Sequence, residues 1–323
     1  MRFYRKCFIL IIMCLLAVAL SSCGNNVDSE NNGGRLHDWA AEYYGSGLAG
    51  LTLGLVNDHE LSHWSVVFLD NITDNLNVQF ANLTERDSEY ILKLFYDYEE
   101  IPFKVDGGDI WLESYVFTLN SMSSMVIPIN LKEDLHFENS HFLTVAVLTA
   151  PNVHAVDLDM MSNSYGVCMT FELTNRNGTR QANAKPTAQE SMAFLELPFQ
   201  GLMLNLDFDA KDDNQVLFPP KEIRAKSDET VKLAYRVGNY ENTDDVLFIV
   251  LVDWQPQIIN GKPFVHITNK PGYISYGVIE ITIPSEKGKY EITGFVDYSP
   301  FALRNENTAW GNETCYRFTL VVE

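Results

Sequence analysis

Five consecutive residues have the types and spacing of a metal-dependent hydrolytic site: His59, Glu60, Leu61, Ser62 and His63. If these residues lie on a helix, the two imidazoles are one turn apart on one face and can bind a zinc ion. Glu60 can then activate the zinc-bound water as a general base. The spacing therefore makes a zinc hydrolase one hypothesis for this chain.

The pattern of these residues, H-E-x-x-H, resembles the signature of the zincin metallopeptidases. Val56 upstream also fits the extended pattern of that family. The resemblance implies that His59 and His63 are zinc ligands and that Glu60 is catalytic. A zinc-dependent metallopeptidase is therefore the alternative function for this chain.

The residues around the motif favour strands over the helix that this chemistry requires. Residues 51–56 and 64–68 are rich in β-branched and aliphatic side chains, and Asn57-Asp58 is typical of a turn. No third zinc ligand is apparent downstream in the sequence. We therefore predict that the motif lies at the polar tip of a hairpin, where the histidines could still bind a metal without catalysis.

A second candidate site is a group of carboxylates at near-alternate positions, which calcium loops use as oxygen ligands. This group consists of Asp207, Asp209, Asp212 and Asp213. The segment lacks the glycine and the closing glutamate of an EF-hand loop, so we expect a solvated turn, with calcium as the alternative.

The start of the chain resembles the signal peptide of a bacterial lipoprotein. Arg2, Arg5 and Lys6 form a positive segment, and the apolar run from Phe8 to Leu20 is too short for a comfortable membrane span. The run ends in Leu-Ser-Ser-Cys, which resembles a lipobox, with the cysteine at position 23.

This resemblance implies that residues 1–22 are removed and that Cys23 becomes the acylated first residue. Residues 23–35, rich in Asn and Gly, would then be a flexible tether. We expect a lipid-anchored protein on the extracytoplasmic face of the cell membrane. Gly24 after the cysteine also permits an outer-membrane location in a bacterium with two membranes.

Composition limits the partners of the folded part. Without the first 22 residues, the chain has 20 basic and 43 acidic residues, a net charge of −23. This charge disfavours nucleic acids and anionic lipids as partners, because both require a basic face. Of the five cysteines, only Cys168 and Cys315 lie beyond Cys23, and we predict two separate buried thiols rather than a disulfide.

Weak internal similarity indicates two copies of one domain. Four short matches keep their order along the chain, with offsets of 138 to 152 residues. They pair residues 78–80 with 216–218, 93–96 with 232–235, 126–129 with 278–281, and 168–173 with 315–320. In this register, residues 64–68 fall opposite 202–206, where nothing resembles H-E-x-x-H.

The segments inside each copy alternate apolar and polar side chains, as residues 278–283 do, which is typical of half-buried strands. Residues 246–252 are apolar throughout and predict a buried central strand. We expect an all-β chain with two tandem antiparallel β-sandwiches at 48–174 and 191–323, joined by a linker at 175–190. The pattern over 200–323 resembles immunoglobulin-like domains of bacterial surface proteins, without the Cys…Trp…Cys signature.

These features predict a binding or scaffolding module rather than an enzyme. The sequence has no nucleophile elbow, P-loop or dinucleotide fingerprint. The expected partner is a cell-wall polymer, a glycan or a protein, and no cofactor is expected unless zinc or calcium binds at the sites above. Aromatic side chains could stack on sugar rings if they face solvent, and the candidates are Trp64, Trp111, Trp254 and Trp310.

Overall fold

The computed structural model describes residues 37–45, 50–57, 65–158, 166–181, 185–188, 193–195, 201–206, 221–238, 245–268, 273–304 and 311–323. By their contacts, the described residues belong to one compact unit. The described part is almost entirely β-structure, as the sequence predicted.

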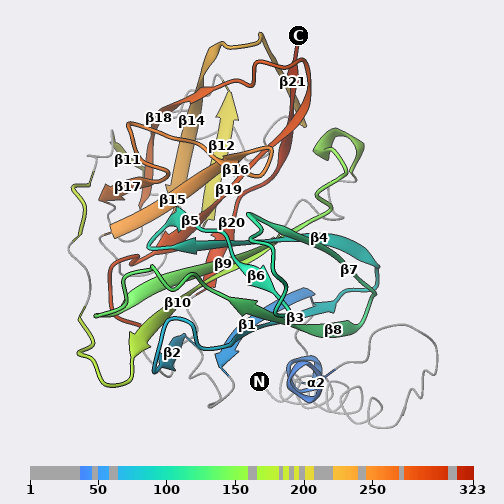
Figure 1. Ribbon diagram of the computed structural model, residues 1–323. Helices are drawn as coiled ribbons and strands as arrows, with labels where there is room; N and C mark the ends of the chain where they lie inside the picture. The colour runs from blue at the N-terminus through green and yellow to red at the C-terminus, as the bar shows by residue number, and fades with distance from the viewer. Residues whose placement is uncertain are drawn as a thin grey trace, which may run out of the picture. The chain divides into compact units, whose positions relative to one another are not determined.

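Strands β1 to β10 form a sandwich of two sheets (Figure 1). The first sheet has the order β1 (Gly50–Asn57), β3 (Leu76–Leu83), β8 (Ser123–Asn130) and β6 (Lys104–Val105). The second sheet contains β2 (Val66–Leu69), β10 (Gly166–Asn175), β9 (His141–Thr149), β4 (Ser88–Tyr96), β5 (Glu99–Glu100) and β7 (Tyr115–Leu119). Neighbouring strands are antiparallel, except that β2 runs parallel to β10.

The remaining strands form a second sandwich. One of its sheets has the order β11 (Ala193–Leu195), β18 (Ile274–Thr282), β14 (Thr230–Gly238) and β12 (Gly201–Leu206). The facing sheet contains β13 (Glu222–Ala225), β21 (Phe318–Val322), β19 (Gly288–Tyr298), β15 (Asp245–Val252), β16 (Gln255–Pro256) and β17 (Val265–Thr268). Here β13 runs parallel to β21, as β2 does to β10. The two sandwiches share the order of three strands in one sheet, β1-β3-β8 and β12-β14-β18, and they share this parallel pair in the other sheet. The fourth strand differs, because β6 follows β5 in the chain whereas β11 precedes β12. Two packed antiparallel sheets of this kind are those of immunoglobulin-like sandwiches.

Each sandwich has its own hydrophobic core, built by alternation along the strands. In β4, Tyr90, Leu92 and Leu94 face the first core, and in β15, Val246, Phe248 and Val250 face the second core. This period of two is the one that the sequence analysis used to predict strands.

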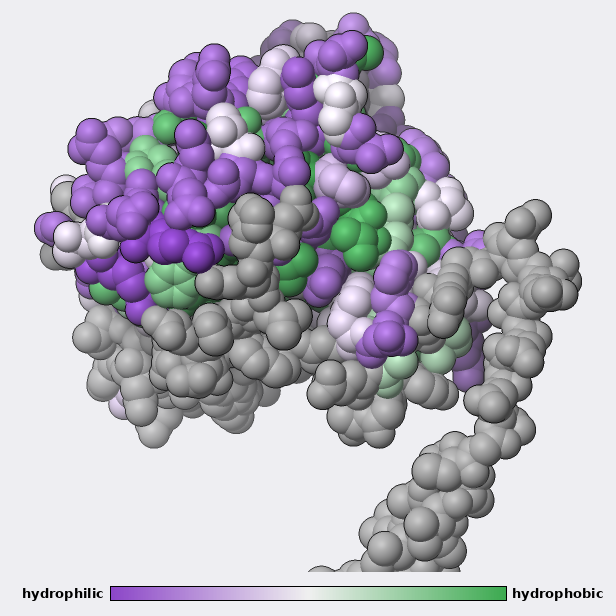
Figure 2. All heavy atoms as spheres, turned by 60° about the horizontal axis from the view of Figure 1, so that its bottom comes forward, coloured by the Kyte–Doolittle hydropathy of each residue, from purple (hydrophilic) through white to green (hydrophobic). Residues whose placement is uncertain are grey.

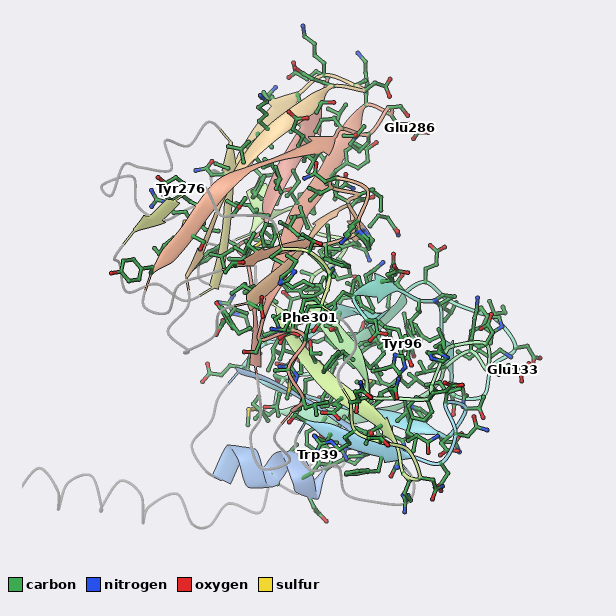
Figure 3. The ribbon with its side chains drawn as sticks, turned by 90° about the vertical axis from the view of Figure 1, so that its left-hand side faces the viewer. Trp39, Tyr96, Glu133, Tyr276, Glu286 and Phe301 are labelled. Carbon is green, nitrogen blue, oxygen red and sulfur yellow. The ribbon has the colours of Figure 1, made fainter. Side chains whose placement is uncertain are left out.

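A third core lies between the two sandwiches, where β4, β9, β10, β15 and β19 each contribute apolar side chains from the face that points away from their own core. Its members are Ile91, Phe95, Tyr98, Phe142, Ala146, Leu148, Cys168, Leu247, Ile249, Leu251, Trp254, Phe264, Phe295 and Phe301. Phe301 lies between the two sets of strands in Figure 3. The short strand β20 (Gly311–Thr314) pairs with both β10 and β19. It therefore joins the β10 sheet of the first sandwich to the β19 sheet of the second in one 13-stranded sheet.

The backbone conformation of the turns shows which residues of the two copies are equivalent. The turn Asp97-Tyr98 has positive φ at both residues (48° and 70°), and so has Asp253-Trp254 (50° and 67°). The turns Asp106-Gly107 and Asn260-Gly261 also share this conformation.

Two of the four sequence matches join equivalent strands: residues 126–129 and 278–281 lie in β8 and β18, and the last match lies at β10 and β21. The match of 93–96 with 232–235 is wrong, because it joins β4 with β14, which is the equivalent of β3. The placement of 64–68 opposite 202–206 is wrong as well, since β12 corresponds to β1. Residues 216–218 lie outside the described residues.

The pairing of strands β1 and β2 differs from the hairpin that the sequence analysis predicted. Both flanks of the H-E-x-x-H motif are strands, as expected, but β1 pairs with β3 and β2 pairs with β10. They belong to opposite sheets and do not form a hairpin with each other.

A short helix, α2 (Asp38–Gly45), precedes the first sandwich in the chain. Its Ala40 packs against Ala81 and Leu83 of β3, and the His37 N–H donates to Ser124 Oγ at 2.7 Å. Within the described part of the chain, no helix has the length and apolarity that a membrane span requires.

Residues between the two sandwiches contact both of them. Arg180 bonds to Glu172 of β10, Lys185 pairs with Asp245 of β15, and the Pro186 carbonyl oxygen lies 3.1 Å from His266 Nδ1. This segment coincides with the predicted linker at 175–190, and the domain boundaries stay a prediction.

Candidate functional site

The residues with the strongest sequence signals lie outside the described residues. They are Cys23 of the lipobox, His59, Glu60 and His63 of the zinc motif, and Asp207, Asp209, Asp212 and Asp213 of the acidic group. The lipid, zinc and calcium assignments therefore remain predictions.

The two cysteines beyond the lipobox are free and buried, as predicted. Burial raises the pKa of Cys168 well above its ordinary value and raises the pKa of Cys315 to about 12. Both thiols are therefore protonated at neutral pH and are poor nucleophiles.

Aromatic side chains divide clearly between core and surface. Trp254 belongs to the third core, whereas Trp111 is 40% exposed. Trp64 and Trp310 lie outside the described residues. Figure 2 shows one face of the molecule, where hydrophilic residues cover most of the described surface and hydrophobic residues form only small groups.

The largest polar cluster joins the two sandwiches through Tyr98, at the turn between β4 and β5. Its hydroxyl oxygen lies 2.8 Å from Asp297 Oδ2 and 2.5 Å from the Pro300 carbonyl oxygen. Arg304 Nη2 donates to both oxygens of Asp297, at 3.0 and 2.7 Å. Burial opposes the charge of Arg304, but Asp297 outweighs this effect and leaves the arginine pKa raised. The ion pair therefore stays charged inside the protein.

Glu172 of β10 extends this cluster. Its carboxylate accepts hydrogen bonds from Ser140 Oγ at 2.7 Å, from Arg180 Nε at 2.9 Å and from the Arg304 backbone N–H at 2.7 Å. Burial acts to raise the pKa of Glu172, but these donors outweigh burial and lower it. The carboxylate is thus fully used in holding segments from both sandwiches together.

Glu291 is the centre of a second buried cluster. It accepts a hydrogen bond from Thr319 Oγ1 at 2.8 Å, and Arg317 Nε lies 2.8 Å from its Oε2. Arg317 also donates to the Thr149 carbonyl oxygen at 2.7 Å, and its guanidinium lies 5.2 Å from the Trp254 ring centre. Burial lowers the pKa of Arg317. This cluster also connects the second sandwich with β9 of the first.

An aspartate and a histidine form the pair that most resembles acid–base machinery. Asp97 Oδ2 lies 2.7 Å from His141 Nδ1, and Asp97 Oδ1 accepts the Phe142 backbone N–H at 2.9 Å. Tyr96 stacks on the imidazole with ring centres 5.0 Å apart. Because His141 is buried and stacked against Tyr96, we assign the pair of Asp97 and His141 to the packing of the β4–β5 turn. The sequence analysis had no signal for this pair.

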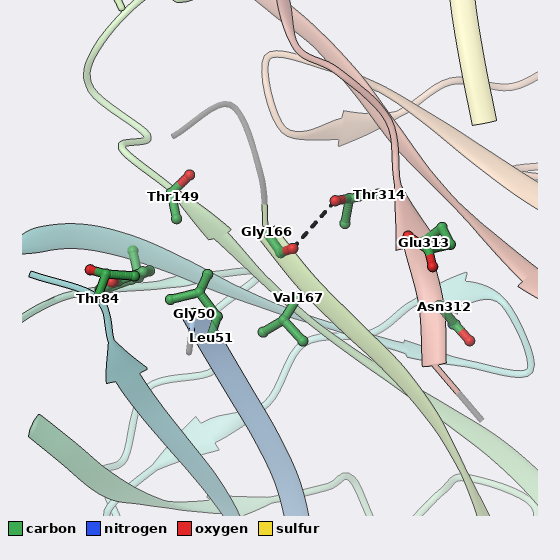
Figure 4. Close-up of a pocket in the computed structure, with 10 residues that line it drawn as sticks. Gly50, Leu51, Thr84, Thr149, Gly166, Val167, Asn312, Glu313 and Thr314 are labelled. Carbon is green, nitrogen blue, oxygen red and sulfur yellow. Dashed lines mark hydrogen bonds between the residues drawn. The ribbon is translucent and has the colours of Figure 1, made fainter. Parts of the chain in front are cut away.

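The candidate ligand site is a pocket of about 480 Å³ where β20 meets the first sandwich (Figure 4). Its lining residues are Gly50, Leu51, Thr84, Tyr90, Thr149, Gly166, Val167, Asn312, Glu313 and Thr314. Three threonine hydroxyls, one phenol and one carboxyl group therefore share a small space with apolar atoms, the mixture typical of small-ligand sites.

Two titratable groups of this pocket have raised pKa values. Glu313 is exposed at the pocket rim, but partial desolvation of its carboxyl group still raises its pKa. Burial raises the pKa of Tyr90 to about 12. Thr314 Oγ1 donates to the Gly166 carbonyl oxygen at 3.3 Å, which fixes one wall. A group that donates hydrogen bonds, such as a hydroxyl or an ammonium group, would complement this carboxyl group.

The pocket depends on a glycine at the start of β10. A Cβ atom on Gly166 would lie 2.5 Å from the Val147 carbonyl oxygen and 2.6 Å from Leu148 Cδ2. No side chain fits there, so the strands approach closely. Sequence reasoning missed this pocket because its lining comes from strands of both copies.

Comparisons with known proteins give no family. No protein-family model matches the chain, and no curated protein matches it. Among solved structures, it is similar to a red sea bream transglutaminase at 11% identity and a TM-score of 0.23, covering 87% of this chain and 33% of the transglutaminase.

Two further similar structures are smaller proteins. The calcium-binding domain CBD12 of CALX1.1 has 8% identity and a TM-score of 0.22, covering 81% of this chain and 99% of that chain. The E. coli chaperone DraB has 10% identity and a TM-score of 0.26, and the match covers 84% of this chain and 98% of the DraB chain. The sandwich assignment above rests on the strand order of this chain and not on these scores.

Proposed function

We propose that this protein is a membrane-tethered, extracytoplasmic binding or scaffolding module. The support from the sequence is the lipobox at Cys23 and the tether that follows it. The support from the fold is the third core, which locks two immunoglobulin-like sandwiches together. Such a body presents its surface loops in fixed relative positions, as a scaffold or a receptor for an extended ligand requires.

The third core is the observation that carries the proposal. It is accompanied by ion pairs of residues that are almost fully buried, Arg304 with Asp297 and Arg317 with Glu291. Charged groups inside a protein are costly unless they are paired, so these four residues are committed to structure. In the described part of the chain, exposed polar groups that remain for recognition lie in loops, in the pocket beside β20 and on strands, as Lys232 of β14 and Glu280 of β18 do.

The experiment that tests the tether is membrane fractionation of a bacterium that produces the full chain. The variant Cys23→Ser should leave the membrane fraction or keep its uncleaved N-terminus, and only the parent chain should yield an acylated peptide beginning at Cys23. The control Cys168→Ser removes a buried thiol and should leave fractionation unchanged. An unmodified Cys23 in the parent chain would refute the anchor.

The zinc metallopeptidase remains the second candidate, because its motif is present in the sequence. The strands on either side leave the eight residues 58–65 for the motif, which is room for about two helical turns. Metal analysis of the full chain beside the double variant His59→Ala with His63→Ala separates the candidates. Stoichiometric zinc that is lost in the double variant would support the enzyme.

A further inference from the structure

The two copies of the repeat differ in the connection that follows their equivalent turns. In the first copy the turn ends at Gly108, and six residues, 109–114, separate it from β7. In the second copy the equivalent turn ends at Lys262, and only two residues separate it from β17. The first copy therefore has four extra residues, and we name residues 109–114 the insertion loop.

The insertion loop is held in place by its backbone. The Leu112 N–H donates to the Phe103 carbonyl oxygen at 2.8 Å, and the Phe103 N–H donates to the Leu112 carbonyl oxygen at 2.9 Å. The Gly108 N–H closes the preceding turn on the Val105 carbonyl oxygen at 3.0 Å. The side chains of the loop are therefore presented from a defined backbone.

Two large apolar side chains of the insertion loop face solvent. Ile110 is 73% exposed and Trp111 is 40% exposed. In the second copy, the corresponding short connection directs Phe264 into the third core. Since the same fold is completed without the extra residues, the fold itself does not require the exposure of Ile110 and Trp111.

Two lysine ammonium groups lie over the Trp111 ring. Lys104 Nζ is 5.1 Å and Lys132 Nζ is 5.5 Å from the centre of the Trp111 ring. In a chain with such an excess of acidic residues, this pairing creates a local site for an anionic group. Asp106 and Asp109, close to Trp111 in the sequence, are also exposed and can accept hydrogen bonds.

We propose that the insertion loop binds a saccharide that carries a carboxylate group. The apolar face of the sugar would pack on Trp111 and Ile110, while its carboxylate would pair with Lys104 and Lys132. The aspartates would accept hydrogen bonds from sugar hydroxyls. This inference rests on the proposed binding function, but it does not depend on the lipid anchor.

The size of the patch favours a sugar over a protein partner. A stable protein interface covers about 800 Å² on each side and has an apolar centre. The insertion loop offers only two exposed apolar side chains, Ile110 and Trp111, with charged residues near them in the sequence, which is far fewer than such an interface needs. A membrane surface is disfavoured by the negative charge of the chain.

The test is calorimetric titration of the full chain in detergent with tetragalacturonate and, separately, with the neutral cellotetraose. We expect binding of tetragalacturonate, weakened at least about tenfold in Trp111→Ala, since about 1.4 kcal/mol corresponds to a factor of ten. In the double variant Lys104→Gln with Lys132→Gln, tetragalacturonate should bind no better than cellotetraose. The control is Ile258→Ala, which removes a side chain that is 66% exposed in the second copy and should change nothing.

Three outcomes would overturn the proposal. They are binding of neither sugar, equal binding of both sugars by the parent chain, and binding that survives Trp111→Ala. A photo-cross-linking residue at position 110 addresses the protein alternative in cells. Conjugates to one defined protein, together with no sugar binding, would replace the saccharide by that protein. Failure of the Cys23→Ser fractionation test would leave the sugar result unaffected, so the two proposals fail separately.

Discussion

The Tyr98 hydroxyl oxygen of the first sandwich lies 2.8 Å from Asp297 Oδ2 of the second. The Tyr98 ring contacts Phe142 of its own sandwich and Phe264 and Phe301 of the other. One side chain at a tight turn thus joins the third core to the buried ion pair of Asp297 and Arg304. The two sandwiches should therefore unfold together.

The first prediction concerns this contact. Tyr98→Phe keeps the ring but removes the hydroxyl group from a buried, charged acceptor, and we expect a loss of about 1–3 kcal/mol in the free energy of unfolding. Urea unfolding followed by circular dichroism measures this loss. The parent chain should show one transition, and the variant a lower midpoint with the same slope.

Tyr290→Phe is the matched control, since the Tyr290 hydroxyl donates to the Glu286 carbonyl oxygen at the surface. It should change the free energy of unfolding by less than about 0.5 kcal/mol. Two separate transitions in the parent chain, or equal effects of both variants, would mean that the sandwiches are not energetically coupled.

The sequence predicted the strands because alternation follows directly from one buried face. It also contained the signal for the third core, which we interpreted too narrowly. Residues 246–252 are apolar at every position because Val246 and Phe248 face one core while Leu247 and Ile249 face another. A run without alternation predicts burial on both faces, but it does not identify what covers the second face.

The register of the repeat could be predicted only in part. Strands β8 and β18 keep similar side chains, so their match was correct. The clearest equivalence, between Asp97-Tyr98 and Asp253-Trp254, is a backbone conformation that short identities do not reveal. The pocket at Glu313 was missed for a related reason, since its residues come together only when β20 pairs across the two copies.

The second prediction concerns Lys93, which is fully buried on the outer face of β4 and pairs with Glu100 of β5. The equivalent positions in the second copy are Ile249 and Pro256, so the fold does not require this ion pair. Lys93→Ile leaves Glu100 in an environment where burial already raises its pKa. We expect a loss of about 2–4 kcal/mol in urea unfolding, since breaking a buried pair leaves a charge without compensation.

The double variant Lys93→Ile with Glu100→Leu provides the control for this pair. It replaces both charges by apolar side chains and should recover the parent stability to within about 1 kcal/mol. If the single variant is as stable as the parent, or if the double variant is no better than the single one, the pair does not have the assigned role.

The third prediction concerns the close approach of strands at Gly166. In Gly166→Ala the new Cβ atom would lie 2.5 Å from the Val147 carbonyl oxygen, which belongs to the backbone of β9. We expect a loss of about 1–3 kcal/mol, because neighbouring strands must move apart. Gly54→Ala is the control, since its nearest neighbour would be the Gln79 side chain at 3.4 Å. Thermal unfolding that ranks the two variants equally would contradict the close packing of the pocket wall.

The last prediction follows from the pKa of Glu313, which partial desolvation raises above its ordinary value of 4.5. At a pH between the ordinary pKa and the raised pKa of the folded state, the unfolded chain has lost a proton that the folded chain still holds. The folded state therefore binds more protons than the unfolded state in this range. The free energy of unfolding must then fall as the pH rises from about 4.5 through the folded pKa. Glu313→Gln cannot titrate, and the difference in stability between variant and parent should therefore increase over this pH range. Urea midpoints measured from pH 4 to pH 8 test this, and a difference that is independent of pH would show that Glu313 is fully solvated in the pocket.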